Sequence, residues 1–319
     1  MMPTEPRVGV VILNWNSARD TTTCVESLRK STYANLHVII IDNGSTDDSL
    51  IHVRPLAAQT DSVLIEAGEN LGFPGGCNLG ARRVLADGAD YVFLLNADTE
   101  IDASALSRLI DVAESDPNIG VVTPKIFYFD DASMVWYGGA EFDWRYLVGR
   151  QVGYGLRDDV RYDVEADVPW ATGCAMLISR AAVDAVGLLN EDFFFGTEDL
   201  DYSLRITARG YRIRYVPSAK LWHKEAAAAG GRDNPQYVYY QVRNVLLLRR
   251  IWASGVAGRL RAIAFSWVWI GRRSLTYAAG GNWRCLVATA YGIADHLRRA
   301  YGRREYPLIA RRRAPRKTA

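Results

Sequence analysis

Four short apolar runs, separated by stretches with the pattern of helices, occupy the first third of the chain. Their β-branched composition is typical of strands that are buried in a parallel sheet. The runs are Arg7–Leu13, His37–Ile41, Ser62–Glu66 and Tyr91–Leu95. Strands that alternate with helices in this way predict an α/β fold with a Rossmann-like, mostly parallel sheet and right-handed crossovers.

Beyond Ile119 the pattern changes to β structure that is rich in aromatic residues. We expect a helix over Asp199–Ala208, two separate strands over Tyr211–Val216 and Lys220–His223, and mostly helices from Pro235 onward. The small, glycine-rich segment Ala226–Asn234 is predicted to be mobile, and it could close over a bound ligand.

The charge is divided unevenly along the chain. From Val245 to Ala319 there are 16 Lys/Arg and 2 Asp/Glu, a net charge of +14, whereas the residues before Val245 hold 22 Lys/Arg and 34 Asp/Glu, a net charge of −12. This shift predicts an acidic domain over residues 1–244 and a basic helical region over residues 245–319, with a short tail from Arg311.

The four cysteines are far apart in the sequence, which favours reduced thiols over a disulfide framework or a zinc site. We see no secretory signal, so a cytoplasmic protein is expected. The apolar stretches Ala262–Gly271 and Cys285–Ala294 are shorter than the roughly 20 residues that a membrane-spanning helix needs.

Polar side chains follow the predicted strands. Because the carboxyl ends of parallel strands meet at one edge of a sheet, these side chains should line a nucleotide pocket. They are Asn14, Asn16, Asp42, Asn70 and Asp98. An acid after the second strand commonly accepts hydrogen bonds from a ribose or base, although Asp42 could equally be a turn former beside Asn43 and Gly44. No Gly-x-Gly-x-x-Gly loop follows the first strand and no Walker loop occurs, which disfavours dinucleotide enzymes and P-loop proteins.

Two acidic clusters are candidates for chemistry. Asp98 suits Mg²⁺ or Mn²⁺ bound together with substrate phosphates, or it could be a helix N-cap. Asp199, with Glu198 and Asp201 beside it, suits a general base because clustered carboxylates raise one another's pKa, or it could be ordinary N-terminal helix charge. His223 could contact a metal or phosphate, or it could be structural.

Taken in order, these segments resemble glycosyltransferase family 2, the inverting nucleotide-sugar enzymes with the GT-A fold. The resemblance covers residues 7–245. It is carried by Val11–Asn16, Ile41–Asp47, Glu69–Phe73 with Gly76 and Asn78, Leu95–Asp98, Gly173, Thr197–Asp199 and His223. The Asn70–Phe73 loop, the Phe194–Asp201 segment and Tyr239-Tyr240 with Arg243-Asn244 look like the bacterial rhamnosyltransferase branch, whose members use dTDP-rhamnose to build cell-surface polysaccharide.

The resemblance implies a role for each motif. Asp199, with Glu198, would act as the catalytic base, and Asp98 and His223 would hold the Mg²⁺ or Mn²⁺ cofactor. The acceptor side would include Trp170, Gly173 and Asp201. The donor side would include Asn14, Asn16, Asp42, Asn70, Gly72, Asn78, Asn96 and Asp98. Asn96 replaces the first acid of the family's Asp-x-Asp motif, which keeps an oxygen ligand but removes one charge.

Taken together, these features predict a metal-dependent, inverting hexosyltransferase that transfers rhamnose from dTDP-rhamnose to a saccharide or lipid-linked acceptor. The alternatives are a UDP-sugar transferase (galactosyl, galactofuranosyl or glucosyl) and a non-catalytic nucleotide-sugar-binding protein. A sugar nucleotidyltransferase is disfavoured because the segment Asn14–Arg19 lacks glycine. Tryptophan among many arginines over residues 256–304 suits the inner membrane surface, with packing or a homodimer as the alternative. Nucleic acid is a poor fit because the body is acidic.

Overall fold

A computed structural model describes residues 5–224, 233–306 and 308. The predicted α/β fold is confirmed, and its first half is a parallel sheet in the order β3-β2-β1-β4. These strands are β1 (Val8–Asn14), β2 (Leu36–Asp42), β3 (Val63–Glu66) and β4 (Tyr91–Asn96). Each lies within a few residues of the apolar run that predicted it.

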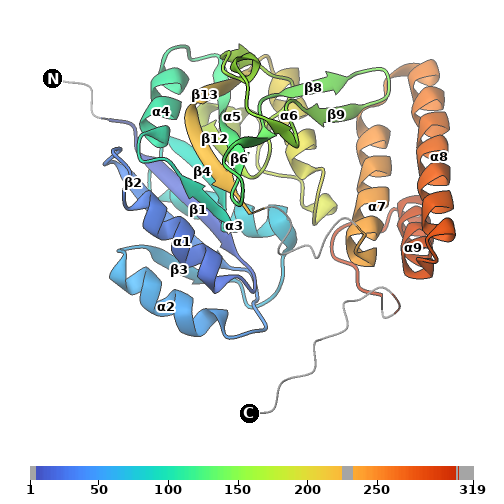
Figure 1. Ribbon diagram of the computed structural model, residues 1–319, viewed down its shortest axis with the longest axis horizontal. Helices are drawn as coiled ribbons and strands as arrows, with labels where there is room; N and C mark the ends of the chain where they lie inside the picture. Colours follow the sequence, from blue (N-terminus) through green and yellow to red (C-terminus); the bar gives the residue numbers. More distant parts are fainter. Residues whose placement is uncertain (1–4, 225–232, 307, 309–319) are drawn as a thin grey trace. The chain divides into compact units, whose positions relative to one another are not determined.

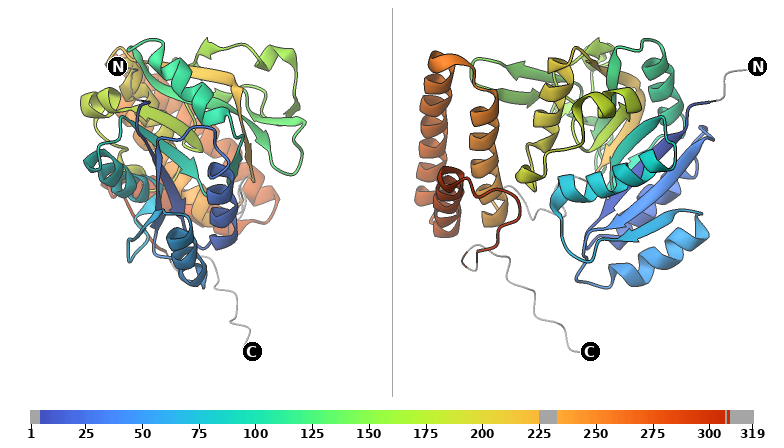
Figure 2. Two further views of the ribbon diagram at one scale, coloured as in Figure 1. Left: turned by 90° about the vertical axis from the view of Figure 1, so that its left-hand side faces the viewer. Right: turned by 180° about the vertical axis from the view of Figure 1, so that it is seen from behind.

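The helices between these strands cover both faces of the sheet. The sheet grows from β1 to β2 to β3, so right-handed crossovers put α1 (Ala18–Leu28) and α2 (Ser49–Gln59) on one face. The chain then reverses to β4, which puts α3 (Gly72–Ala86) on the other face. Figure 1 shows α1 in front of the strands, and the view from behind in Figure 2 shows α3 in front of them. This reversal makes a topological switch point between β1 and β4, where ligands of such sheets bind.

The glycine-rich stretch after β3 leads directly into a helix, because α3 begins at Gly72. Its glycines let α3 approach the sheet closely. A Cβ at Gly76 would lie 2.3 Å from Leu13 Cδ1, and one at Gly80 would lie 2.3 Å from Val11 Cγ1. These contacts explain the glycines by helix–strand packing.

The second half of the sheet is mixed. β12 (Ala175–Ser179) runs antiparallel between β4 and β6 (Ile119–Tyr128), and β13 (Arg212–His223) runs parallel to β6. The two strands predicted at 211–216 and 220–223 are therefore one strand, which crosses a register shift between Val216 and Lys220. The remaining elements are β5 (Thr99–Ile101), β7 (Met134–Tyr137), β8 (Ala140–Asp143), β9 (Val148–Gln151), β10 (Leu156–Arg157), β11 (Ala166–Asp167), α4 (Ala105–Glu114), α5 (Arg180–Val186), α6 (Glu198–Ala208) and the 3₁₀ turns Val160–Tyr162 and Glu191–Phe193.

The described residues form two compact units. The sheet unit holds residues 5–144, 148–191 and 198–224, and the C-terminal unit holds 145–147, 192–197 and the described residues from 233 onward. The C-terminal unit consists mainly of α7 (Pro235–Trp252), α8 (Gly255–Ala279) and α9 (Trp283–Arg298), which pack on one another. The boundary expected between residues 244 and 245 falls within α7.

Most of the segment expected to be mobile, 226–232, and the basic tail 311–319 lie outside the described residues. All four cysteines are free and buried. Within the described residues, no helix is both long and apolar enough to cross a membrane.

Candidate active site

The ends of β1, β2 and β4 lie side by side, as predicted. Asn14 pairs in register with Asp42, and Leu13 pairs with Asn96. The polar residues that follow these strands therefore meet at one edge of the sheet, next to the switch point.

The Asp42 carboxylate is almost fully buried, with 1% of the residue exposed. Oδ1 accepts hydrogen bonds from Asn14 Nδ2 at 2.8 Å and from Ser45 Oγ at 2.6 Å, and Oδ2 accepts one from Ser45 N at 3.1 Å. Thr21 Oγ1 in turn donates to Asn14 Oδ1 at 2.8 Å. Asn14 and Asp42 thus brace the turn after β2, and Ser45 is a member of this network that sequence analysis did not single out.

Asn16, two residues beyond the end of β1, supports the same turn. Its backbone is left-handed, with a φ of 54°, and its Oδ1 accepts hydrogen bonds from Thr46 N at 2.7 Å and Asp47 N at 3.3 Å. Asn tolerates this conformation better than most residues. The turn 42–47 is therefore fixed by side chains from two strands.

The two predicted donor-side asparagines near α3 have different surroundings. Asn70 Oδ1 accepts from Gly72 N at 2.8 Å and so fixes the start of α3. Asn78 is buried, and its Nδ2 donates to Leu189 O at 2.9 Å and to Glu191 Oε1 at 2.8 Å. Asn78 thus links α3 to the segment after α5. Its contacts in the structure are those of a residue that supports the site.

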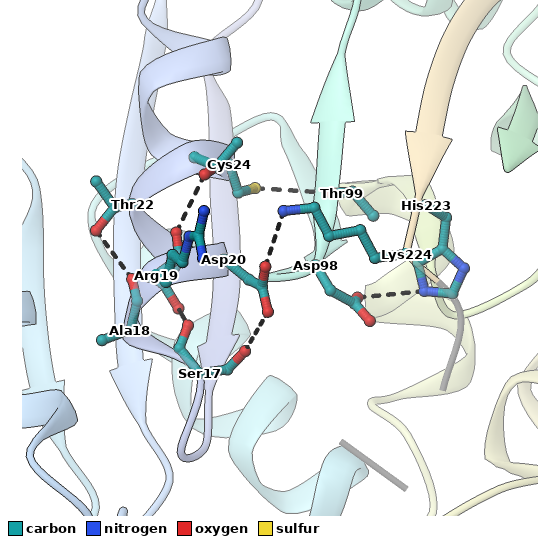
Figure 3. A network of polar contacts seen from close by, with 12 residues as sticks. Ser17, Ala18, Arg19, Asp20, Thr22, Cys24, Asp98, Thr99, His223 and Lys224 are labelled. Carbon is teal, nitrogen blue, oxygen red and sulfur yellow. Dashed lines mark hydrogen bonds and ion pairs between the residues drawn. The ribbon is translucent and has the colours of Figure 1, made fainter. Parts of the chain in front are cut away.

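Asp98 and His223 form an ion pair at the end of β4 and β13 (Figure 3). His223 Nε2 lies 3.2 Å from Asp98 Oδ1, with 6% of the His side chain and 16% of the Asp side chain exposed. Burial raises the pKa of Asp98, but the hydrogen bond and charge of His223 outweigh it, so the net shift is downward. Burial lowers the pKa of His223, but Cys174 and Asp98 outweigh it, so this pKa lies well above 6.5. The pair is predicted to be charged near neutral pH.

A second ion pair, which sequence analysis missed, lies beside the first (Figure 3). Lys224 Nζ is 2.9 Å from Asp20 Oδ1, and Ser17 Oγ donates to Asp20 Oδ2 at 2.9 Å. Ser17 therefore holds Asp20, and its side chain does not cap α1. The Lys224 amide donates to Asp98 O at 3.0 Å, so this pair links α1 to the Asp98 turn.

Asp199 has a different environment on the first turn of α6. Its Oδ2 accepts from Gly173 N at 3.1 Å and its Oδ1 from Leu200 N at 2.7 Å. Burial raises the pKa of Asp199, and these backbone N–H groups only partly oppose it. The pKa is raised as predicted, but the cause is desolvation and not the neighbouring acids. Asp201 instead forms an ion pair with Arg205 at 3.0 Å.

Two consecutive residues connect the acidic clusters. Cys174 O accepts from Asn96 N at 2.9 Å, and the preceding Gly173 N is the donor to Asp199. Burial raises the pKa of the Cys174 thiol, His223 partly opposes this shift, and Asp98 and Asp199 both add smaller increases. The fold therefore brings the two clusters to one region. Trp170, three residues before Gly173, is 8% exposed, and its Nε1 donates to Glu141 O at 3.2 Å.

The segment that leads into α6 is fixed by two buried residues of α7, all within the C-terminal unit. Asn244 Nδ2 donates to the carbonyls of Phe193, Phe195 and Gly196 at 2.7–2.9 Å, and Arg243 donates to those of Asp192 and Phe193 at 2.9 Å. Phe194, Gly196 and Thr197 have φ values of 60°, 80° and 80°. Left-handed backbone is costly for a β-branched threonine, so the hydrogen bonds hold a strained path.

The Asp98 and His223 side chains also fit a divalent ion, which would replace the proton that His223 Nε2 shares with Asp98 Oδ1. Bonds of about 2.0–2.1 Å at right angles put two neighbouring ligands about 3 Å apart, close to the observed separation. No group of three His, Cys, Asp or Glu side chains suited to a metal occurs in the described ranges 5–224 and 233–306. A site with few protein ligands is the kind that completes its coordination with substrate phosphates.

The acid–imidazole pair and the second acid, whose pKa is raised, thus lie near the switch point, where sheets of this kind bind their ligands. The sequence model described as glycosyl transferase family 2 matches residues 9–187, more than half of the chain. The chain therefore belongs to glycosyl transferase family 2, and its sheet unit is a glycosyltransferase domain of the GT-A type.

Relatives and solved structures agree with this assignment. Protein y4gI of Sinorhizobium fredii, uncharacterized, is 28% identical over 257 residues, which are 77% of this chain and 28% of that protein. The poly-β-1,6-N-acetyl-D-glucosamine synthase of Staphylococcus aureus is 26% identical over 269 residues, 80% of this chain and 60% of the synthase. The chain thus spans less than two thirds of either relative. The mannosyltransferase PcManGT of Pyrobaculum calidifontis, solved with GDP-Man and Mn²⁺, has the same fold, with a TM-score of 0.58, 15% identity, and coverage of 93% of this chain and 89% of that chain.

Proposed function

We propose that this protein is a metal-dependent, inverting hexosyltransferase that moves a sugar from a nucleoside diphosphate to an acceptor hydroxyl. The observation that carries this proposal is the Asp199 carboxylate, whose pKa is raised by burial and which is held by two backbone N–H groups. A base with a raised pKa is better matched to a hydroxyl proton than an ordinary carboxylate is.

In the proposed reaction, Asp199 accepts the proton of the acceptor hydroxyl. The hydroxyl oxygen attacks the anomeric carbon on the face opposite the diphosphate, and a new C–O bond forms as the bond to the diphosphate oxygen breaks. The configuration at the anomeric carbon is thereby inverted. The N–H groups of Gly173 and Leu200 keep the carboxylate oriented, and Glu198, buried on the same helical turn, completes the acidic end of α6.

Asp98 and His223 are the residues that would hold Mg²⁺ or Mn²⁺ on the donor side. A bound divalent ion neutralises charge that grows on the departing diphosphate. Asn96 is the last residue of β4 that pairs with β1, opposite Leu13, and we propose that its side-chain oxygen contributes to the donor side. The turn 42–47, braced by Asn14 and Asn16, is the proposed nucleoside platform, and Asn70 and Gly72 bound its other side.

Rhamnose from dTDP-rhamnose is the first donor that we propose, on the strength of the motifs shared with the bacterial rhamnosyltransferase branch. UDP-sugars are the second, because the staphylococcal relative is named for a polymer of N-acetylglucosamine. On the acceptor side we propose a saccharide or lipid-linked sugar bound near Trp170 and Gly173, in the synthesis of a bacterial surface glycan. A membrane surface and a second copy of the chain are the two further partners proposed for residues 256–304.

Thermal stabilisation by nucleotides tests the donor part of this proposal. dTDP, UDP, GDP and CMP are each added with Mg²⁺, Mn²⁺ or EDTA, and the melting temperature is measured. A ligand at 100 times its Kd stabilises the fold by about 2.7 kcal/mol, which is readily detected. We expect a metal-dependent shift with dTDP or UDP. A protein that no nucleotide stabilises would contradict a donor site.

Transfer itself is tested with dTDP-rhamnose or a UDP-hexose and a panel of saccharide and lipid-linked acceptors. The anomeric configuration of the product is read by NMR. An inverted product supports Asp199 as the base in a single displacement, whereas a retained configuration would contradict the mechanism. Donor hydrolysis without transfer identifies a working donor site that lacks its acceptor.

A further inference from the structure

One side of α8 is both apolar and exposed along almost its whole length. The exposed fractions are 77% for Val256, 62% for Leu260, 55% for Ile263, 54% for Trp267, 57% for Val268 and 72% for Leu275. At about 100° per residue, these six side chains fall within one arc of about 140° around the helix axis. The other positions in that arc are alanine, glycine and one serine, so the arc contains no charged residue.

The opposite side of α8 accounts for the packing of the helix. Ala262, Ser266, Ile270 and Tyr277 are buried, and α8 packs on α7 and α9. The exposed apolar arc is therefore separate from the side of α8 that packs within the C-terminal unit. An exposed apolar surface that runs along several helical turns is typical of an interaction site.

The charges on α8 indicate what this face contacts. The helix carries Arg259, Arg261, Arg272 and Arg273 and no acidic residue. Arg261 and Arg272 are exposed at one border of the arc, and Arg259 is exposed near the other. Arginine borders on an apolar face complement an anionic lipid surface.

A second copy of the chain, bound through the same face of α8, is a less suitable partner than an anionic membrane. Pairing two α8 helices through their apolar arcs would bring their arginine borders together, and α8 supplies no carboxylate to offset that repulsion. A transmembrane position is also unsuitable, because α8 is not apolar enough to span a bilayer. The remaining arrangement is a helix that lies in the plane of the interface.

We propose that α8 docks this protein on a membrane that contains anionic lipid, with Leu260, Ile263 and Trp267 inserted and the flanking arginines at the headgroups. This inference does not depend on the sugar that is transferred. A glycosyltransferase held there would meet acceptors that carry a lipid anchor.

Vesicle co-sedimentation of the full chain tests the proposal. The vesicles are phosphatidylcholine alone, or phosphatidylcholine with about one third phosphatidylglycerol. We expect binding to the anionic vesicles, weaker binding to the neutral ones, and release from the anionic ones as salt is raised.

Two pairs of substitutions on α8 separate the apolar and basic contributions. Leu260→Gln with Trp267→Gln should lower the partition coefficient about tenfold or more, since both side chains lose apolar burial in the bilayer. Arg261→Gln with Arg272→Gln should lower binding to anionic vesicles about tenfold and leave binding to neutral vesicles unchanged. All four side chains are exposed, so the melting temperature in solution should stay close to that of the unsubstituted chain.

As a matched control, one aliphatic residue and one tryptophan that are exposed in the sheet unit are also replaced by glutamine. Ile51 and Trp144 are 69% and 61% exposed in the sheet unit, and Ile51→Gln with Trp144→Gln should bind vesicles like the unsubstituted chain. The proposal is overturned if the α8 pair binds normally, or if neutral and anionic vesicles bind equally. It is also overturned if sedimentation shows a dimer that Leu260→Gln with Trp267→Gln abolishes while no vesicle binds, since a second copy would then cover the face.

Discussion

Asp98 and Asp199 are two acids of one domain whose surroundings differ in kind. Asp98 has a cationic side chain, His223, as its partner, and its pKa is lowered. Asp199 has backbone N–H groups as partners, and its pKa is raised by burial. Environments that push two pKa values apart are how a protein assigns different tasks to the same functional group.

The same contrast applies to how each acid is positioned. Asp98 is oriented by a side chain from a neighbouring strand, so one substitution can release it. Asp199 is oriented by the path of the main chain at Gly173 and at the start of α6. We therefore expect Asp98 to be sensitive to its partner, and Asp199 to be sensitive to the backbone around it.

The largest expected effect follows from Asp199→Asn. Loss of a general base typically lowers the rate by about 10²–10⁴-fold, so kcat should fall about 1000-fold. Nucleotide binding should persist, as judged by the thermal shift with dTDP or UDP. Asp111→Asn, at an exposed acid on α4, is the control and should retain full activity. Normal turnover by Asp199→Asn would remove the distinction between the two acids.

Asp98→Asn should have the next largest effect. The substitution removes the charge that suits this side chain to a metal, so we expect about a 100-fold lower rate. It should also remove the difference between the thermal shifts with Mn²⁺ and with EDTA. If Asp98→Asn keeps a full metal-dependent shift, the donor-side ion is held elsewhere.

The pH dependence of the rate sharpens the comparison further. Asp199 must be ionised to accept a proton, and its pKa lies above the ordinary value of 3.8. The rate should therefore fall about tenfold per pH unit once the pH drops below that raised pKa, well before an exposed aspartate would titrate. The measurement is kcat/KM against pH at saturating metal. A profile that stays flat to about pH 4 would be incompatible with a raised pKa.

The smallest effect is expected when the hydrogen bonds that hold the segment before Asp199 are removed. Asn244→Leu keeps similar volume but leaves the carbonyls of Phe193, Phe195 and Gly196 without this donor, so we expect a loss of about 1–3 kcal/mol in the free energy of unfolding. Denaturant titration measures it. Gln236→Leu, at a partly exposed site on the same helix, is the control. Unchanged stability of Asn244→Leu would show that the segment holds its path unaided.

Much of the fold was predictable from sequence because buried parallel strands are continuous β-branched runs. The meeting of Asn14 and Asp42 at one edge of the sheet followed from strand direction, because parallel strands end on the same side. The start of α3 at Gly72 is hard to place from sequence, because glycine marks loops and close helix packing equally well. β13 was divided in two, because Pro217 and Ser218 interrupt its pattern while the pairing with β6 resumes after a shift.

The site was predictable where residues lie at strand ends and less so where distant residues meet. The acids and His223 stood out by type and position. The Asp20–Lys224 pair joins residues 204 positions apart, and no local pattern marks it. The source of the raised pKa of Asp199 was also hidden, because the sequence displays neighbouring acids but not desolvation.

The hydrogen bonds from Arg243 and Asn244 to residues 192–196 also have a consequence for synthesis of the chain. These partners lie about fifty residues further along, so a nascent chain that has just released β13 carries Asp98, Asp199 and the described strands of the sheet without them. The strained entry to α6 acquires its donors only when α7 has emerged from the ribosome. The contacts that fix the segment before α6 therefore form only after translation has passed residue 244, and a chain released early would contain Asp98 and Asp199 without them.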